Sequence, residues 1–391
     1  MELTQETLQS LPALVLGFLL AALVTLVATP IVRGFARRVG MVDRPEARRV
    51  NKEAVARGGG VAVAIGFIGV SAAMVLVNAK AGHPFLKEAA YVHANQIEAL
   101  LGGGALAVAI GLLDDVFQLR ARWQLLGQLA LGAFALYLGM TFNIVNIPFV
   151  GDGGARLPEA VVGLATLVWI VGMINSINFI DGLDGLSSGI ALIAAITLGL
   201  ISIGPDTNQP FVALFCFILA GALAGFLRWN FNPASIFTGT SGIMLVGYSL
   251  AVLSILGAAK VAVALLVLGV PIIDTFWIIV RRLASRRSPF APDRGHIHHR
   301  LLDLGLSHRA TVLLIYAVCV VLATLSLVLA GTDATYAFLG LAILGGLILL
   351  ALEQLGGGVG AIEESLSATS YENGNGSAGT PATGPNGEGG K

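Results

Sequence analysis

The sequence has few charged residues. Only 12% of its 391 residues are Asp, Glu, Lys or Arg, about half of the roughly 25% found in soluble domains. Lys and Arg together number 23, as do Asp and Glu, so no excess of positive charge points to nucleic acid as a partner. With 56% hydrophobic residues and a mean hydropathy of +0.84, the composition excludes a soluble enzyme, a disordered chain and a DNA-binding module. It is typical of a protein that crosses the lipid bilayer several times.

Cysteine is scarce as well. The two cysteines, Cys216 and Cys319, both lie inside apolar stretches. They are too few and too isolated for a disulfide framework or a metal cluster. We expect both to be small buried hydrophobic side chains.

In place of charge, the chain has a series of long apolar runs. A helix needs about 20 mostly apolar residues to cross roughly 30 Å of hydrocarbon. The runs are continuous rather than alternating, which favours helices over a β-barrel. The sequence therefore predicts an all-α polytopic membrane protein with eleven transmembrane helices, at residues 11–32, 58–78, 97–113, 123–142, 159–175, 186–203, 210–228, 241–258, 261–280, 311–330 and 334–352.

The basic residues predict the orientation. With the N-terminus outside, 18 of the 23 Lys and Arg residues fall in cytoplasmic loops and 4 in outer loops. This split fits the positive-inside rule, so we expect an N-out, C-in protein of the cell membrane. Residues 356–391 are rich in Gly, Ser, Asn and Pro and are expected to form a disordered cytoplasmic tail behind a membrane domain of residues 1–355.

A pair of carboxylates, Asp114 and Asp115, ends the third apolar run. Two carboxylates at the C-terminal end of a helix meet the negative end of its dipole and each other. The arrangement is unfavourable unless a cation offsets it. The pair is either a functional site at membrane depth or a helix end paired with Arg120 or Arg122.

Amides and carboxylates recur at every third position of a second segment, at Asn175, Asn178, Asp181 and Asp184. Neighbouring glycines allow the chain to bend closely around a ligand. Such oxygen atoms suit Mg²⁺, which keeps waters and substrate phosphates among its ligands. The alternative is that these residues cap turns and the next helix, but four at a strict spacing exceed what capping requires.

Histidines and arginines gather in the loop after the ninth run, at Arg294, His296, His298, His299 and Arg300. Three histidines could bind zinc, but no cysteine or fourth ligand accompanies them. Histidine and arginine side chains together are better suited to a phosphate or diphosphate. Cytoplasmic topology alone would explain the arginines but not the histidines.

Two other segments carry weaker signals. Arg57 precedes three glycines that open the second run, where unpaired N–H groups could bind an anion or merely face solvent. Phe237 lies in an aromatic, amide and glycine segment that could hold a nucleobase or form an aromatic belt. Taken together, these groups converge on one cytoplasmic face, where they suit metal-assisted chemistry on phosphate groups at the lipid surface.

Five segments carry a resemblance to a known family. They read VDRPEARRVNKEAVARGGG, GLLDDVFQL, NSINFIDGLDGL, RWNFNPASIFTGTSG and PIIDTFWIIVRRLASRRSPFAPDRGHIHHRLLDLGLS. In these segments and their order, the chain resembles the polyprenyl-phosphate N-acetylhexosamine-1-phosphate transferases over nearly all of residues 11–350. The His-x-His-His form is more similar to the N-acetylglucosamine-1-phosphate branch than to the peptidoglycan-precursor branch.

The resemblance implies a reaction and its partners. A polyprenyl phosphate attacks the β-phosphate of a UDP-N-acetylhexosamine, giving a polyprenyl-diphosphate sugar and UMP and starting a lipid-linked cell-envelope glycan. Mg²⁺ or Mn²⁺ is the implied cofactor. The implied partners are the UDP-sugar, the polyprenyl phosphate and the lipid bilayer, with a second copy of the chain as a further candidate.

The resemblance also implies roles for individual residues. Asp114 and Asp115 match an acidic pair that binds or deprotonates the lipid phosphate. Positions lining the nucleotide and catalytic site are matched by Asn175, Asn178, Asp181 and Asp184, with Asp115 and Asp181 as metal ligands. Phe237 matches a position near the uracil. The diphosphate-binding motif is matched by Arg294, His296, His298, His299 and Arg300.

The chain departs from the family pattern at several charged positions. Thr240 stands where the family has a metal-binding Asp, and its neutral hydroxyl is a poorer ligand for a divalent cation. Gln124 replaces a Lys, Asn51 a His, and Gln118 a frequent acidic residue. These departures support a second hypothesis, a catalytically impaired relative that binds the lipid phosphate or the nucleotide sugar. A transporter is a third, but the charges lie at one interface rather than at the bilayer midplane.

Overall fold

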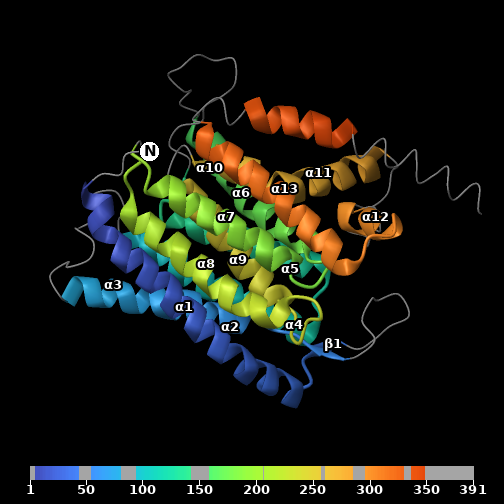
Figure 1. Ribbon diagram of the computed structural model, residues 1–391, viewed down its shortest axis with the longest axis horizontal. Coiled ribbons are helices and arrows are strands. Elements are labelled where there is room, and N and C mark those ends of the chain that lie inside the picture. Colours follow the sequence, from blue (N-terminus) through green and yellow to red (C-terminus); the bar gives the residue numbers. More distant parts are fainter. Residues whose placement is uncertain are drawn as a thin grey trace, which may run out of the picture. The chain divides into compact units, whose positions relative to one another are not determined.

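A computed structural model describes residues 5–43, 54–80, 94–141, 158–205, 207–256, 260–284, 296–329 and 336–347. Contacts between Cα atoms divide the chain into a unit of residues Met1–Ile343 and a unit of residues Leu344–Lys391. The elements labelled in Figure 1 belong to the first unit. The tail expected at 356–391 and the boundary at residue 355 lie outside the described residues and stay predictions.

Helices make up almost all of the described regular structure. The short second span contains a π-helical turn, η1, which interrupts it between α2 and α3. The elements are α1 (Gln5–Arg38), β1 (Val42–Asp43), β2 (Val55–Ala56), α2 (Gly60–Ala64), η1 (Ile65–Gly69), α3 (Val70–Lys80), α4 (Ala94–Phe117), α5 (Ala121–Tyr137), α6 (Glu159–Ile180), α7 (Leu186–Ser202), α8 (Pro210–Asn230), α9 (Gly239–Ile255), α10 (Lys260–Val267), α11 (Gly269–Ala284), α12 (Ile297–Asp303) and α13 (His308–Val328).

Every one of the eleven predicted runs contains a helix, but the helices differ in length. In the described part of the chain, six are long and apolar enough to cross a membrane: Thr7–Arg38, Gly60–Lys80, Ala94–Phe117, Glu159–Ile180, Pro210–Asn230 and His308–Val328. Three further apolar helices are shorter, and the run predicted at 261–280 is divided into α10 and α11. The protein is therefore an all-α, multi-pass membrane protein, while the count of eleven spans and the orientation stay predictions.

α8 and α9 form the centre of the helical unit, and most of their side chains are buried; Figure 1 shows the two helices among their neighbours. α8 packs against α1 and α7, and α9 packs against α4 and α6. The closest approach uses small residues. A Cβ atom on Gly221 or Gly225 would lie 2.1 or 2.2 Å from the backbone oxygens of Phe18 and Ala22 in α1. Such spacing lets two helix backbones touch, as in many membrane helix pairs.

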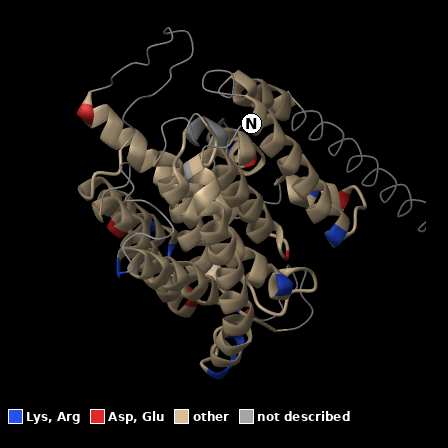
Figure 2. Ribbon diagram, turned by 60° about the vertical axis from the view of Figure 1, so that its left-hand side comes forward, with Lys and Arg blue, Asp and Glu red and all other residues tan. Residues whose placement is uncertain are grey.

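Charged side chains avoid the middle of the helices. In Figure 2 the helices are almost entirely tan along their length, and the blue and red residues lie near helix ends and in the connections. Because a charge at the bilayer centre costs several kcal/mol, this distribution agrees with helices that cross lipid. It leaves the polar chemistry to the helix ends.

Several helix ends meet where the chain forms its only strands in the described residues. β1 and β2 pair antiparallel, and Ala56 forms a parallel bridge with Ile236 in the link between α8 and α9. The ends of α4 and α6, the link from α6 to α7 and the start of α9 reach the same region, as their shared cavity shows. The sequence predicted neither the strand pair nor the short helix α12.

Candidate active site

A cavity of about 400 Å³ opens where these helix ends and links meet. Acidic, basic, amide and aromatic side chains line it together. Its polar and aromatic lining includes Asp43, Arg57, Asp115, Asn178, Asp181, Asp184, Asn230, Phe237, Thr240, His299 and His308. These residues come from segments that are as far apart in the sequence as β1 and α13. The structure thus brings the acidic pair region, the 175–186 segment and the histidine segment to one place.

Asp115 joins the end of α4 to the start of α9. Its Oδ1 accepts a hydrogen bond from the Thr240 N–H (2.7 Å), and its Oδ2 accepts from the Ser241 N–H (3.0 Å) and hydroxyl (2.7 Å). A carboxylate is favoured there because the N–H groups at a helix N-terminus carry partial positive charge. Gly239 allows the close approach: its φ is +70°, and a Cβ there would lie 2.7 Å from Oδ2.

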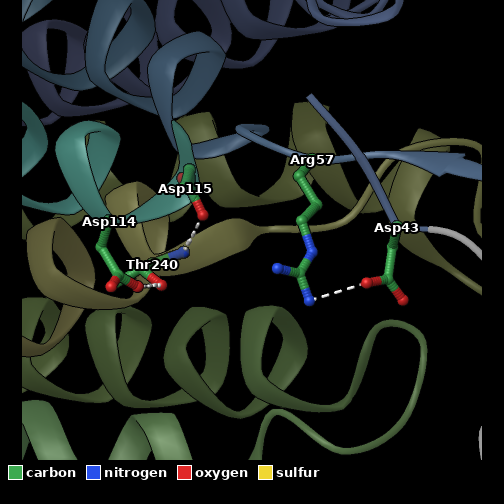
Figure 3. A network of polar contacts seen from close by, with 5 residues as sticks. All are labelled: Asp43, Arg57, Asp114, Asp115 and Thr240. Carbon is green, nitrogen blue, oxygen red and sulfur yellow. Dashed lines mark hydrogen bonds and ion pairs between the residues drawn. The ribbon is translucent and has the colours of Figure 1, made fainter. Parts of the chain in front are cut away.

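Asp114 makes different contacts and does not line the cavity. Its Oδ1 accepts from the Leu119 N–H and from Nε2 of Gln124, both at 2.9 Å. Its Oδ2 accepts from the hydroxyl of Thr240 at 2.6 Å (Figure 3). The partner that the sequence suggested for this carboxylate was an arginine of the following turn. The structure supplies neutral donors instead, so Asp114 supports the wall of the cavity from behind.

Asp181 follows the last residue of α6 and borders the cavity. Its Oδ1 accepts a hydrogen bond from the hydroxyl of Ser187. Removal from bulk water raises the pKa of this carboxyl to about 7, and the negative charges of Asp115 and Asp184 act in the same direction. The Ser187 hydrogen bond and the charge of Arg57 oppose that rise. An incoming cation would therefore stabilise the charged form of Asp181.

Asp184 holds the link between α8 and α9. Its Oδ2 accepts from Nδ2 of Asn232 and from the Ala234 N–H, both at 3.0 Å. Arg309, at the start of α13, donates two hydrogen bonds to the backbone oxygen of Asn232, at 3.1 and 2.9 Å. One oxygen of Asp184 therefore has a structural task, although the residue also lines the cavity.

The glycines after Arg57 serve packing rather than anion binding. The N–H of Gly59 donates to the Phe237 oxygen (2.9 Å), and the N–H of Gly60 donates to the Thr238 oxygen (2.8 Å). A Cβ on Gly60 would lie 1.9 Å from the backbone nitrogen of Gly242. The interpretation of these two N–H groups as an anion site is wrong, because the backbone already uses them.

His296 begins the histidine segment and is fixed by Asp274 of α11. Its Nδ1 lies 2.7 Å from Oδ2 of Asp274, whose Oδ1 accepts from the Ile297 N–H at 3.0 Å. The ring stacks with those of Phe179 and His298, with centroids 5.8 and 5.5 Å apart. His296 thus orients the start of α12.

His298 and His299 differ in surroundings although they are adjacent. His299 lines the cavity. His298 is 1% exposed and packs against Gly182, where a Cβ would lie 2.2 Å from its Nε2. Neither ring nitrogen of His298 has a hydrogen-bond partner among the described residues. Burial lowers the pKa of His298 to about 3, and the neighbouring histidines act in the same direction, so the ring is neutral at pH 7.

Other predicted site residues lie away from the cavity or outside the described residues. Asn175 donates to Oε1 of Gln128 at 2.6 Å and joins α6 to α5. Arg300 belongs to α12 and is absent from the cavity lining. Arg294 and Asn51 fall outside the described residues.

The structure adds cavity residues that the site prediction did not include: Arg57, Asp43, Asn230 and His308. Arg57 Nη2 lies 2.8 Å from Oδ1 of Asp43, and Figure 3 shows the pair beside the acidic residues. The glycines after Arg57 were a signal for it. Asp43 lies in the segment VDRPEARRVNKEAVARGGG, which also contains Arg57, whereas His308 lies outside the five segments and only the fold brings it to the cavity.

The donor set fits Mg²⁺ better than zinc. In the part of the chain that the structure describes, no group of three His, Cys, Asp or Glu side chains is arranged to hold a metal ion, so the zinc alternative for the histidines gains no support. Mg²⁺ commonly takes one or two carboxylates and completes its shell with water and substrate phosphates. Asp115 and Asp181 can supply those carboxylates, whereas Thr240 offers only a neutral hydroxyl, which donates its proton to Asp114.

Comparison with known proteins gives consistent matches. Residues 97–258 match the model of glycosyl transferase family 4. A probable undecaprenyl-phosphate N-acetylglucosaminyl 1-phosphate transferase of Bacillus subtilis is 33% identical over 315 residues, covering 78% of this chain and 82% of that protein. A decaprenyl-phosphate N-acetylglucosaminephosphotransferase of Mycolicibacterium smegmatis is 34% identical over 76% of this chain and 77% of its own length. An Escherichia coli undecaprenyl-phosphate alpha-N-acetylglucosaminyl 1-phosphate transferase is 26% identical over 75% and 77%.

Proposed function

Since the chain belongs to glycosyl transferase family 4 and is a phosphoglycosyl transferase, we propose that it transfers N-acetylglucosamine 1-phosphate from UDP-N-acetylglucosamine to a polyprenyl phosphate. The products are a polyprenyl-diphosphate sugar and UMP, and the lipid-linked sugar starts a cell-envelope glycan. The names of the relatives support the transferred group and the lipid acceptor. The enzyme works in the cell membrane with its cavity on the cytoplasmic side.

The observation that carries the proposal is the composition of the cavity. Four carboxylates, a guanidinium, two amides, two histidines and an aromatic ring line one space of about 400 Å³ at the ends of membrane helices. A nucleotide sugar presents a base, a diphosphate and a sugar, which need these kinds of partner. The phosphate group of a polyprenyl phosphate lies at the membrane surface, so it can reach a cavity at the ends of the membrane helices.

The reaction joins two negatively charged phosphates. An oxygen of the lipid phosphate forms a bond to the sugar-bearing phosphorus, and the bond from that phosphorus to the bridging oxygen breaks. UMP leaves with the bridging oxygen and its electron pair. A phosphate monoester has a second pKa of about 6, so the lipid phosphate is mostly a dianion at pH 7 and needs little help from a base. The main barrier is bringing the two anions together.

The cavity residues can lower this barrier by neutralising phosphate charge, by holding a metal ion and by positioning the substrates. Arg57, His299 and His308 can place positive charge or hydrogen-bond donors beside the phosphates. Asp115 and Asp181 would hold Mg²⁺ or Mn²⁺, which supplies positive charge at the diphosphate when bound. Phe237 offers a ring for the uracil, and Asn178 an amide for a polar group of the substrate. Asp114 keeps Thr240 and the start of α9 in place.

Turnover by the purified protein tests the proposal. We expect UMP release from UDP-N-acetylglucosamine and undecaprenyl phosphate with Mg²⁺, and loss of activity with EDTA or in Asp181→Asn. Arg122→Ala is the matched control because Arg122 is exposed and absent from the cavity lining. A panel of UDP-sugars, including UDP-N-acetylgalactosamine, identifies the donor.

Measuring ligand binding as well as UMP release distinguishes an active enzyme from a catalytically impaired relative. Thermal stabilisation by UDP-N-acetylglucosamine without UMP release would identify a protein that binds its ligands but does not turn them over. Absence of both binding and turnover with every UDP-sugar would overturn the proposed function.

A further inference from the structure

Arg57 faces the cavity with only part of its hydrogen-bonding capacity in use. Nη2 contacts Asp43 at 2.8 Å, and the described residues give the guanidinium no other partner. A guanidinium carries five N–H donors, so Nε and Nη1 remain for another acceptor. In Figure 3 the second terminal nitrogen points away from Asp43, toward the side of the view where Asp115 and Thr240 lie.

The position of Arg57 is fixed by its backbone. Its N–H donates to the Met41 oxygen at 2.9 Å, and the preceding residue, Ala56, accepts from the Phe237 N–H at 2.9 Å. Asp43, on the paired strand, is 8% exposed and Arg57 is 30% exposed. The guanidinium is therefore held at the cavity wall before a ligand arrives, which reduces the entropy lost on binding.

The charges around Arg57 show what it is suited to bind. Among the described lining residues it is the one Lys or Arg, whereas Asp115, Asp181 and Asp184 are acidic. No ion pair within 4.0 Å joins Arg57 to any of these three carboxylates in the described residues. An arginine whose guanidinium contacts only one carboxylate has N–H donors left for an incoming anion. Its planar fork matches phosphate oxygens well.

We propose that Arg57 binds a phosphoryl oxygen of one of the two substrates, and that Asp43 is the positioning residue that orients its guanidinium for this contact. The inference rests on the proposed function, because that function brings phosphates into the cavity. The phosphate can belong to the diphosphate of the nucleotide sugar or to the lipid phosphate. The chemistry of the contact is the same in both cases.

Two pairs of probes test the contact directly, each pair differing by its phosphates. Thermal stabilisation is measured with UDP against uridine and with farnesyl phosphate against farnesol, for wild type, Arg57→Ala, Arg57→Lys and Asp43→Ala. Arg122→Ala is again the control, an arginine outside the cavity. We expect Arg57→Ala to weaken binding of one phosphorylated probe by about ten- to a hundred-fold, the range of a lost hydrogen bond between charged groups. Uridine and farnesol should be unaffected.

Steady-state kinetics provide the second readout. Arg57→Ala should raise the KM of the same substrate whose probe it weakens, Arg57→Lys should recover part of the loss, and Asp43→Ala should fall between wild type and Arg57→Ala. A weaker response to UDP assigns the contact to the donor, and a weaker response to farnesyl phosphate assigns it to the acceptor.

Unchanged binding of both phosphorylated probes, or a lower melting temperature with unchanged KM values, would overturn the inference and leave Arg57 a structural residue. Failure of the proposed function looks different. In that case wild type itself would show neither phosphate-dependent binding nor UMP release.

Discussion

The hydroxyl of Thr240 donates a 2.6 Å hydrogen bond to Oδ2 of Asp114. The other oxygen of that carboxylate accepts from Nε2 of Gln124 at 2.9 Å. Residues at the start of α9 and in the first turn of α5 therefore meet on one carboxylate at the end of α4, and Figure 3 shows the contact between Thr240 and Asp114. Thr240 and Gln124 act as a pair, because each satisfies part of the same buried negative charge.

The pairing predicts that Thr240→Asp alone destabilises the protein. A carboxylate at this position would face Asp114 without a proton to donate, so a hydrogen bond worth about 1.5–3 kcal/mol becomes a repulsion. Adding Gln124→Lys supplies a positive charge beside both carboxylates. We expect the double variant to regain stability and UMP release relative to Thr240→Asp, with a coupling free energy of about 1 kcal/mol or more in a double-mutant cycle.

Thr240→Ser is the matched control, since it keeps the hydroxyl and should retain most of the stability. Strict additivity of the two substitutions would contradict the pairing. A gain of stability from Thr240→Asp alone in metal-free buffer would do the same.

The contacts of Asp184 predict that its substitution loosens the link between α8 and α9, about 50 residues further along the chain. Its carboxylate accepts two hydrogen bonds from the link between α8 and α9, from Asn232 and Ala234. Asp184→Ala removes both, so hydrogen exchange over residues 231–236 should become at least about ten-fold faster, as expected for the loss of a bond to a charged group. Hydrogen-exchange mass spectrometry measures this, with Asp303→Ala as a control at an exposed carboxylate. Unchanged exchange in this segment would show that its other contacts, such as those of Arg309 and Asn230, hold it without Asp184.

The sequence predicted the helices well because their signal is local. Long apolar runs and the positions of Pro and Gly indicate where helices begin and end. The break between α10 and α11 has such a signal in Gly269 and Pro271, although we predicted one unbroken run over 261–280. The π-helical turn η1 lies where α1 approaches closely, as at Gly66, where a Cβ would lie 1.9 Å from Oγ1 of Thr25.

The candidate site was only partly predictable, and the reason is again physical. Residue type identified Asp115, Asp181 and His299 as polar groups at helix ends, and they do line the cavity. Residue type alone could not distinguish these residues from Asp114 and His298, which are adjacent to Asp115 and His299 in the sequence but do not line the cavity. Successive side chains on a helix point about 100° apart around its axis, and this rotation decides which of two neighbouring residues faces the cavity.

The close contact between the segment after β2 and the start of α9 predicts that alanine substitutions at Gly60 and at Gly34 change stability in opposite directions. Gly60→Ala should lower stability by about 1–3 kcal/mol or more, because the added carbon would lie 1.9 Å from the backbone nitrogen of Gly242, and no rotamer change can relieve it. Gly34→Ala in α1 meets nothing within 4 Å and should raise stability by up to about 1 kcal/mol through helix propensity. Melting temperatures of the two variants in detergent provide the measurement. Equal behaviour of both variants would contradict the close approach.

His298 predicts how stability depends on pH. Its pKa is lowered to about 3 in the folded protein because the ring is buried beneath Gly182, whereas an unfolded histidine titrates near 6.5. Between these values the unfolded chain binds the proton and the folded protein does not, so stability is complete above about pH 6.5 and falls as the pH is lowered. Each pH unit in this window costs up to about 1.4 kcal/mol from this one group.

His298→Gln has no such proton to bind and should lose less stability between pH 6.5 and 5. Thermal unfolding of both proteins from pH 5 to 8 measures the difference, which should be constant above pH 6.5 and change only below it. Parallel curves over the whole range would show that His298 can take up its proton inside the fold, and hence that it is not sealed from water.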